Sequence, residues 1–120
     1  MKMGHITIRT RYFHEEIDFY KDIVGLKVVR DLRGRGSNIV FLSEKEEDTK
    51  IEVIESSEVT DSGNGAFSIG FHTDDVDKLR AELQSKGLEP TQIISPAPGV
   101  RFFFVTDPAG VQVQFLKEQL

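Results

Sequence analysis

The sequence has no cysteine, no long apolar run and no excess of basic residues. The absence of cysteine excludes disulfides, thiolate metal sites and cysteine nucleophiles. The formal net charge of −5 argues against general binding to nucleic acid or to an anionic membrane, because either partner requires a basic patch. No segment approaches the roughly 20 apolar residues of a membrane span, and residues 1–10 lack the apolar core of a signal peptide. We therefore expect a cytoplasmic protein that binds neither nucleic acid nor membranes.

The glycine motifs of nucleotide-binding and hydrolase folds are also missing. The segment from Gly34 to Gly36 is typical of a turn and lacks the following helix that a phosphate-binding loop requires. A G-x-S-x-G nucleophile motif does not occur. The chain has 120 residues, 38% of them hydrophobic and 29% charged, which predicts one globular domain spanning residues 1–120.

Hydrophobic periodicity predicts the same order of elements twice. In the first half it predicts a strand at 5–10, a helix at 15–24 that ends at Gly25, and strands at 26–32, 38–42 and 51–55. After a polar linker at 56–65, it predicts a strand at 67–73, a helix at 76–86 and strands at 88–94, 101–106 and 111–116. Asp74 and Asp75 are suitable N-caps for the second helix, Gly87 closes it, and Pro96 and Pro98 are expected in a loop.

The two halves, about 4–55 and 66–118, form an internal repeat. Aligning His5 with Ser68 places Arg9 on His72, and Glu52 then falls one residue from the counterpart of Gln114. A repeat of this size is one supersecondary unit used twice. We predict an α+β fold in which two tandem βαβββ modules form a curved mixed sheet around a ligand groove, with the helices outside.

One face of this sheet is expected to be polar and the other apolar. The polar strand positions are His5, Thr7, Arg9, Glu52, Ser68, His72, Gln112 and Gln114. Their apolar neighbours, expected beneath the helices, are Ile6, Ile8, Ile51, Val53, Phe67, Ile69, Phe71, Val113 and Phe115. The polar face is either a solvated surface or, in a curved sheet, the lining of a cavity. In the run 102–104 we expect at least one phenylalanine to face the groove, and core packing is the favoured interpretation for two of the three.

Three segments resemble the motifs of a known family. Residues 19–26 (FYKDIVGL) resemble its "FY…LG" helix end, residues 75–87 resemble its second helix, and residues 107–115 (DPAGVQVQF) resemble its "DPDGN…E" turn and last strand. In this order and spacing the chain is similar to the vicinal oxygen chelate family of glyoxalases, bleomycin-resistance proteins and dioxygenases. The resemblance implies a small-molecule site on a concave sheet face, and a homodimer. It does not fix the function.

The resemblance also implies where a metal would bind. Glyoxalases hold a divalent ion with residues from the first and last strands of each half, which here are His5 and Glu52, then Ser68 and Gln114. Serine is a poor ligand compared with imidazole or carboxylate. The implied metal ligands are therefore His5, Glu52 and Gln114, with Ni, Zn or Mn as the ion; a site without metal is the alternative.

Three further residues are candidates for substrate binding. Arg9 resembles the arginine that holds a substrate carboxylate in glyoxalases, and Ser68 lies at a ligand position. His72 is expected on the same face as Ser68, about 13 Å along the strand at roughly 3.3 Å per residue. His72 and Arg9 either bind an anionic ligand or simply solvate the end of the groove.

Two functions follow. The first, slightly favoured, is a glyoxalase-like lyase or isomerase in which Glu52 is a metal ligand or a base. The second is a metal-free protein that binds a small, antibiotic-like molecule. An extradiol dioxygenase is disfavoured because it needs a second histidine where this chain has Ser68.

Overall fold

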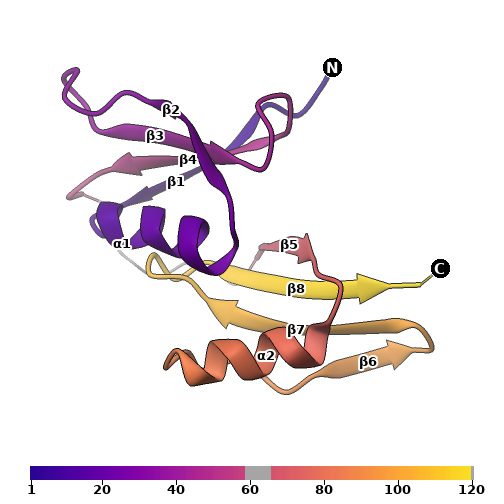
Figure 1. Cartoon of the computed structure of the whole chain (residues 1–120). Helices are drawn as coiled ribbons and strands as arrows, with labels where there is room; N and C mark the ends of the chain where they lie inside the picture. The colour runs from indigo at the N-terminus through magenta and orange to yellow at the C-terminus, as the bar shows by residue number, and fades with distance from the viewer. Residues whose placement is uncertain (59–65, 120) are drawn as a thin grey trace. The chain divides into compact units, whose positions relative to one another are not determined.

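The computed structural model describes residues 1–58 and 66–119 (Figure 1). The chain divides into two compact units, Met1–Ser62 and Gly63–Leu120. Each unit carries one four-stranded mixed sheet and one helical segment between its first and second strands. This confirms the α+β class and the tandem βαβββ modules. The predicted linker at 56–65 lies mostly outside the described residues.

Unit 1 follows the predicted element order closely. Its elements are β1 (His5–Thr10), α1 (Phe13–Asp18), η1 (Phe19–Ile23), β2 (Lys27–Asp31), β3 (Ile39–Ser43) and β4 (Lys50–Glu55). The strand order is β1-β4-β3-β2, in which β1 and β4 are parallel and the other pairs are antiparallel. Helix α1 packs against β4.

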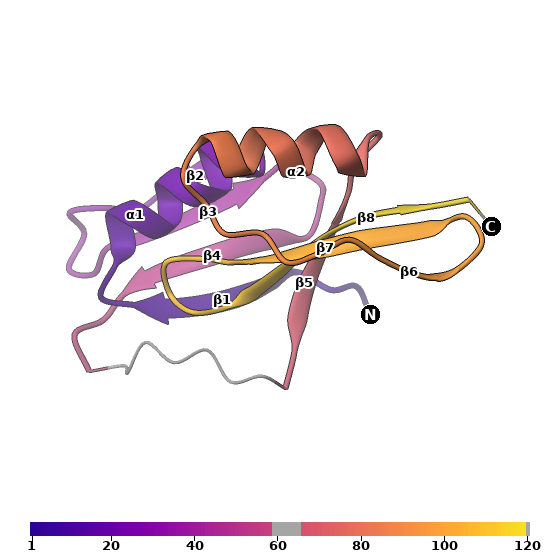
Figure 2. The ribbon, with the colours of Figure 1, turned by 90° about the horizontal axis from the view of Figure 1, so that it is seen from below.

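Unit 2 repeats this topology. Its elements are β5 (Ser68–His72), α2 (Val76–Ser85), β6 (Ile94–Ala97), β7 (Val100–Thr106) and β8 (Gln112–Glu118). The strand order is β5-β8-β7-β6, again with the first and last strands parallel. Helix α2 packs against β7 and β8, so that in each unit the helix covers one face of its own sheet (Figure 2). We call the other face of each sheet its helix-free face. None of the helices in the described residues has the length and apolar character that crossing a bilayer requires.

The helix ends have the expected capping residues. The Asp75 carboxylate accepts the N–H of Lys78 at 3.0 Å and so satisfies a free donor of the first turn of α2. Gly87 has a φ of 86°, and the Leu88 N–H bonds the Leu83 carbonyl at 3.1 Å, as in a Schellman motif. In unit 1 the helix begins at Phe13, two residues before the predicted start, and its second part widens into a π-helix before Gly25.

The core lies on the helix side of each sheet, as alternation predicted. The fully buried side chains include Val40, Leu42 and Val53 in unit 1, and Leu83, Phe103 and Val113 in unit 2. The last turn before β8 is fixed by Asp107, whose buried carboxylate accepts the N–H groups of Ala109 and Val111, each at 2.9 Å. The DPAG motif is therefore a structural turn.

The predicted strand at 88–94 is wrong. Residues 88–93 form no strand, and β6 begins only at Ile94 and includes Pro96, which we expected in a loop. The segment before β6 is joined to β7 by Thr91, whose N–H and hydroxyl both bond the backbone of Phe104. Pro96 is tolerated because β6 is the edge strand of its sheet.

Two expectations for the phenylalanines are also wrong. Phe67 is not in the core: it precedes β5 and is 47% exposed. In the run 102–104 only Phe103 is fully buried, whereas Phe102 and Phe104 alternate with it and are half-buried. The side chains of β7 still alternate between the two faces of the sheet, but aromatic rings lie on both faces.

Candidate functional site

The helix-free face of unit 1 brings two of the predicted ligands together. In the parallel pairing of β1 with β4, Thr7 lies opposite Glu52 and His5 opposite Lys50. His5 and Thr7 are two residues apart on β1 and so share a face. The His5 Nε2 is 3.4 Å from the Glu52 Oε1, and the Thr7 hydroxyl donates to the same oxygen at 2.6 Å. Glu52 is thus held by two neighbours on β1.

Exposure differs within this pair. The Glu52 side chain is 13% exposed, whereas that of His5 is 49% exposed. The carboxylate is therefore shielded and oriented, and the imidazole remains accessible to a ligand. Sequence analysis did not identify Thr7 as the donor that orients Glu52, although its place on the polar face was a signal for such a role.

An aromatic ring completes this part of unit 1. Phe41 lies opposite Glu52 in the β3–β4 pairing, and the His5 ring packs edge-on against it with centroids 5.8 Å apart. The Arg30 guanidinium lies 5.4 Å from the Phe41 ring centroid in a cation–π contact. Phe41 is therefore in contact with both a histidine and an arginine.

The helix-free face of unit 2 has the same layout with neutral residues. In the pairing of β5 with β8, Ser68 lies opposite Gln112 and Gly70 opposite Gln114. A Cβ at Gly70 would lie 3.2 Å from the Gln114 Oε1, so the Gln114 side chain extends over this glycine. A pocket of about 410 Å³ opens beside it, lined by Ala66, Phe67, Ser68, Phe104 and Gln112.

The pairings make the two units equivalent residue by residue. Glu52 lies opposite the residue two after His5, and Gln114 lies opposite the residue two after Ser68. Glu52 and Gln114 therefore occupy equivalent positions in the two sheets, although the alignment of the two halves places them one residue apart. Phe41 and Phe104 also correspond, because each lies opposite the polar residue of the last strand.

The donor set is incomplete for a metal site within unit 1. The part of the chain that the structure describes contains no group of three or more histidine, aspartate or glutamate side chains able to hold an ion. His5 and Glu52 supply two donors. The third predicted ligand, Gln114, belongs to unit 2, where Ser68 and Gln114 supply only neutral oxygen and nitrogen atoms.

The predicted substrate-binding residues lie at different places. Arg9 and His72 are exposed and occupy the far ends of β1 and β5, opposite Ile54 and Leu116. Each is four residues from the candidate ligand position on its strand, about 13 Å at roughly 3.3 Å per residue. Ser68, in contrast, lines the pocket of unit 2.

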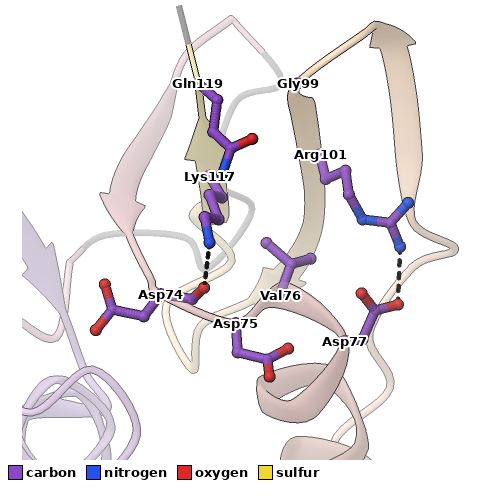
Figure 3. A pocket seen from close by; sticks show the side chains of 8 residues that line it. All are labelled: Asp74, Asp75, Val76, Asp77, Gly99, Arg101, Lys117 and Gln119. Carbon is purple, nitrogen blue, oxygen red and sulfur yellow. Dashed lines mark hydrogen bonds and ion pairs between the residues drawn. The ribbon is translucent and has the colours of Figure 1, made fainter.

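A second pocket, which sequence analysis missed, lies at the start of α2 (Figure 3). Arg101 and Lys117 are directly opposite each other on β7 and β8, an unfavourable pairing of like charges. Arg101 forms an ion pair with Asp77 at 2.8 Å, and the Lys117 Nζ donates to the Asp74 carbonyl at 3.0 Å. These contacts attach the helix to the sheet, so we assign this pocket a structural role.

Comparison with known proteins agrees with this geometry. The model of the Glyoxalase/Bleomycin resistance protein/Dioxygenase superfamily matches residues 2–115. No protein of curated function matches the sequence significantly. Glyoxalase I of Leishmania major is similar over 98% of this chain and 87% of its own, with 26% identity and a TM-score of 0.81.

Two other solved structures cover 96% of this chain. The E144Q mutant of glyoxalase I from Zea mays is 27% identical with a TM-score of 0.78, and the match covers 44% of that protein. An antibiotic-binding protein from Streptomyces is 22% identical with a TM-score of 0.72, and the match covers 93% of that protein. With two repeated sheets and a family match over nearly its whole length, the chain belongs to the Glyoxalase/Bleomycin resistance protein/Dioxygenase superfamily.

Proposed function

We propose that this protein binds a small organic molecule through its helix-free faces and needs no metal to do so. The observation that carries the proposal is the difference between the equivalent pairs of the two units. Unit 1 has His5 and Glu52, whereas unit 2 has Ser68 and Gln114. A divalent transition metal is usually held by three or four imidazole, thiolate or carboxylate donors, and this chain places only two at the family's ligand positions.

The same residues are suited to hydrogen bonding with an organic ligand. The Glu52 carboxylate is shielded and oriented by Thr7 and can accept from a ligand donor. Ser68 lines a pocket, and Arg9 and His72 are accessible for an anionic group of the ligand. The fold is shared with an antibiotic-binding protein of Streptomyces, which supports a binding role.

A glyoxalase-like lyase is the second candidate. It is favoured by the 3.4 Å approach of His5 to Glu52 and by the similarity to two glyoxalase I structures. In this case His5, Glu52 and Gln114 would hold Ni, Zn or Mn, which would polarise vicinal oxygens of the substrate. Glu52 would then be a metal ligand, or a base if displaced from the ion.

Calorimetric titration of the chelator-treated protein with Ni²⁺, Zn²⁺ and Mn²⁺ separates the two candidates. A fragment screen by ¹H–¹⁵N NMR in EDTA is run on the same preparation. The binding role predicts weak or no metal binding, together with fragments that shift amides of β1, β4, β5 or β8. Tight stoichiometric metal binding that is lost in His5→Ala, with fragment binding only in the presence of metal, would contradict the metal-free role and support the lyase instead.

We further propose that the chain acts as one domain, as a homodimer and in the cytoplasm. The dimer rests on the family resemblance. Light scattering after gel filtration measures it directly, and a mass close to one chain would contradict it.

A further inference from the structure

We infer that the pocket of unit 2 binds a neutral, planar aromatic group that carries a hydrogen-bond donor, such as a phenol or an indole. The inference rests on the proposed binding function and names the class of ligand. The observation behind it is the residue of unit 2 that occupies the position equivalent to His5 of unit 1. In unit 1 the His5 ring packs against Phe41, and in unit 2 the corresponding positions are Ser68 and Phe104. The smaller side chain leaves a pocket of about 410 Å³ beside the phenylalanine.

Two aromatic rings line this pocket. Phe67 precedes β5 and is 47% exposed, so its ring is accessible to a ligand. Phe104 is held in place, since Phe102 packs edge-on against it with centroids 5.8 Å apart and Thr91 bonds its backbone. A fixed ring and an exposed ring suit a flat aromatic guest, which gains from edge-to-face or offset stacking in addition to burial.

The polar atoms of the pocket determine which aromatic groups fit. Ser68 contributes a hydroxyl group, and the Gln112 Nε2 donates to the Thr106 hydroxyl at 2.8 Å. That bond orients the amide and leaves its carbonyl oxygen to accept from a ligand. No charged side chain is among the described residues that line this pocket. Because a buried charge without a partner is costly, a neutral donor such as a phenolic O–H is favoured over a charged group.

The test is an NMR titration in EDTA with 2-naphthol and with its non-aromatic analogue, decahydro-2-naphthol. We expect 2-naphthol to shift the amides of Phe67, Ser68, Phe104 and Gln112, and to bind roughly three- to tenfold more tightly than the analogue. Phe67→Ala and Phe67→Leu should each weaken 2-naphthol binding by a similar factor, because leucine keeps apolar bulk but lacks the planar ring. Ser68→His should weaken 2-naphthol binding at least as strongly, because an imidazole at this position would cover Phe104 as His5 covers Phe41.

Tyr12→Ala is the matched control, since Tyr12 is an exposed aromatic residue of unit 1, and its binding should equal that of the unmodified protein. The amide spectrum of each variant without ligand checks that it folds. Equal affinity for the two probes, or an affinity for 2-naphthol that neither Phe67→Ala nor Ser68→His lowers, would overturn the inference. If other fragments shift the helix-free faces while 2-naphthol does not, the inference fails and the proposed function stands. If no fragment binds at all, both fail.

Discussion

The two units share a strand framework and differ in what their helix-free faces carry. Unit 1 has a carboxylate, an imidazole and an arginine around Phe41. Unit 2 has a serine, a glycine and two glutamines around Phe104, with a pocket where the imidazole would be. The pairings among β1, β4 and β3 are equivalent to those among β5, β8 and β7, so this difference comes from the side chains. A duplicated fold therefore does not imply duplicated chemistry.

The largest expected effect is on the free energy of unfolding, when one fully buried core side chain of each unit is truncated. Leu42 and Phe103 are both fully buried on the helix side of their sheets. We expect Leu42→Ala to lower the free energy of unfolding by about 2–5 kcal/mol and Phe103→Ala by about 3–5 kcal/mol, because each leaves a cavity. Urea unfolding followed by amide signals from both units measures this. One domain predicts that both units lose their signals at the same urea concentration in each variant.

The metal test makes unit 2 resemble unit 1. The double variant Ser68→His/Gln114→Glu provides unit 2 with the imidazole and carboxylate that unit 1 already has. We expect its affinity for Ni²⁺ to rise by about 100-fold, since even residues that only orient metal ligands are worth about 10–100-fold. Calorimetry measures the change, and Ser68→Ala/Gln114→Ala is the control that adds no ligand. An unchanged affinity would mean that these strand positions do not form a metal site.

The donor test concerns the hydroxyl that orients Glu52. Thr7→Val keeps the shape of the side chain but removes the hydrogen bond of 2.6 Å to the carboxylate. We expect any Ni²⁺ binding measured for the unmodified protein to weaken by about tenfold, with little change in thermal stability. Thr49→Val is the control, because the Thr49 hydroxyl donates to the backbone carbonyl of Met3 at 3.0 Å and not to a ligand candidate. A loss of equal size in both variants would contradict the specific role of Thr7.

The smallest effect is expected from an exposed ion pair. Arg33 forms hydrogen bonds to both carboxylate oxygens of Asp31, and this side-chain bonding lowers the pKa of Asp31 from 3.8 to about 2. Since the folded value lies below the unfolded one, the stabilisation is present above the unfolded pKa and is lost as the pH falls through about 2. Acid unfolding of Asp31→Asn should show slightly lower stability than the unmodified protein near neutral pH, and this difference should disappear below pH 2. Asp77→Asn, which breaks the exposed pair of unit 2, should show a similarly small loss near neutral pH.

Much of the fold could be predicted because local signals agree with it. Gly25 and Gly87 end helices by their positive φ, and Asp75 begins one by its side-chain cap; neither effect depends on tertiary contacts. The prediction of a strand at 88–94 was wrong because the sequence of this segment does not show which of its residues pair with another strand. Only the pairing of β6 with β7, which depends on distant residues, places the strand at Ile94.

The candidate site could be predicted in part. The alternation of side chains along each strand placed His5 and Glu52 on the same face of the sheet. The distance between them depends on the register of the β1–β4 pairing, which the sequence does not fix to the residue. The pocket beside Ser68 was missed because Phe67 was expected beneath the helices, and the sequence does not show which ring of the run 102–104 faces the groove. The sequence alone does not show whether a phenylalanine lies on the helix-free face or in the core beneath a helix. The structure distinguishes the two positions.

Gly70 shows how such a divergence is accommodated. With no side chain of its own, it lets the amide of Gln114 extend over the edge strand, where Thr7 in the other half binds a carboxylate instead. The chemical character of a helix-free face can therefore change by a few exchanges on one sheet, without disturbing the packing that keeps the molecule folded.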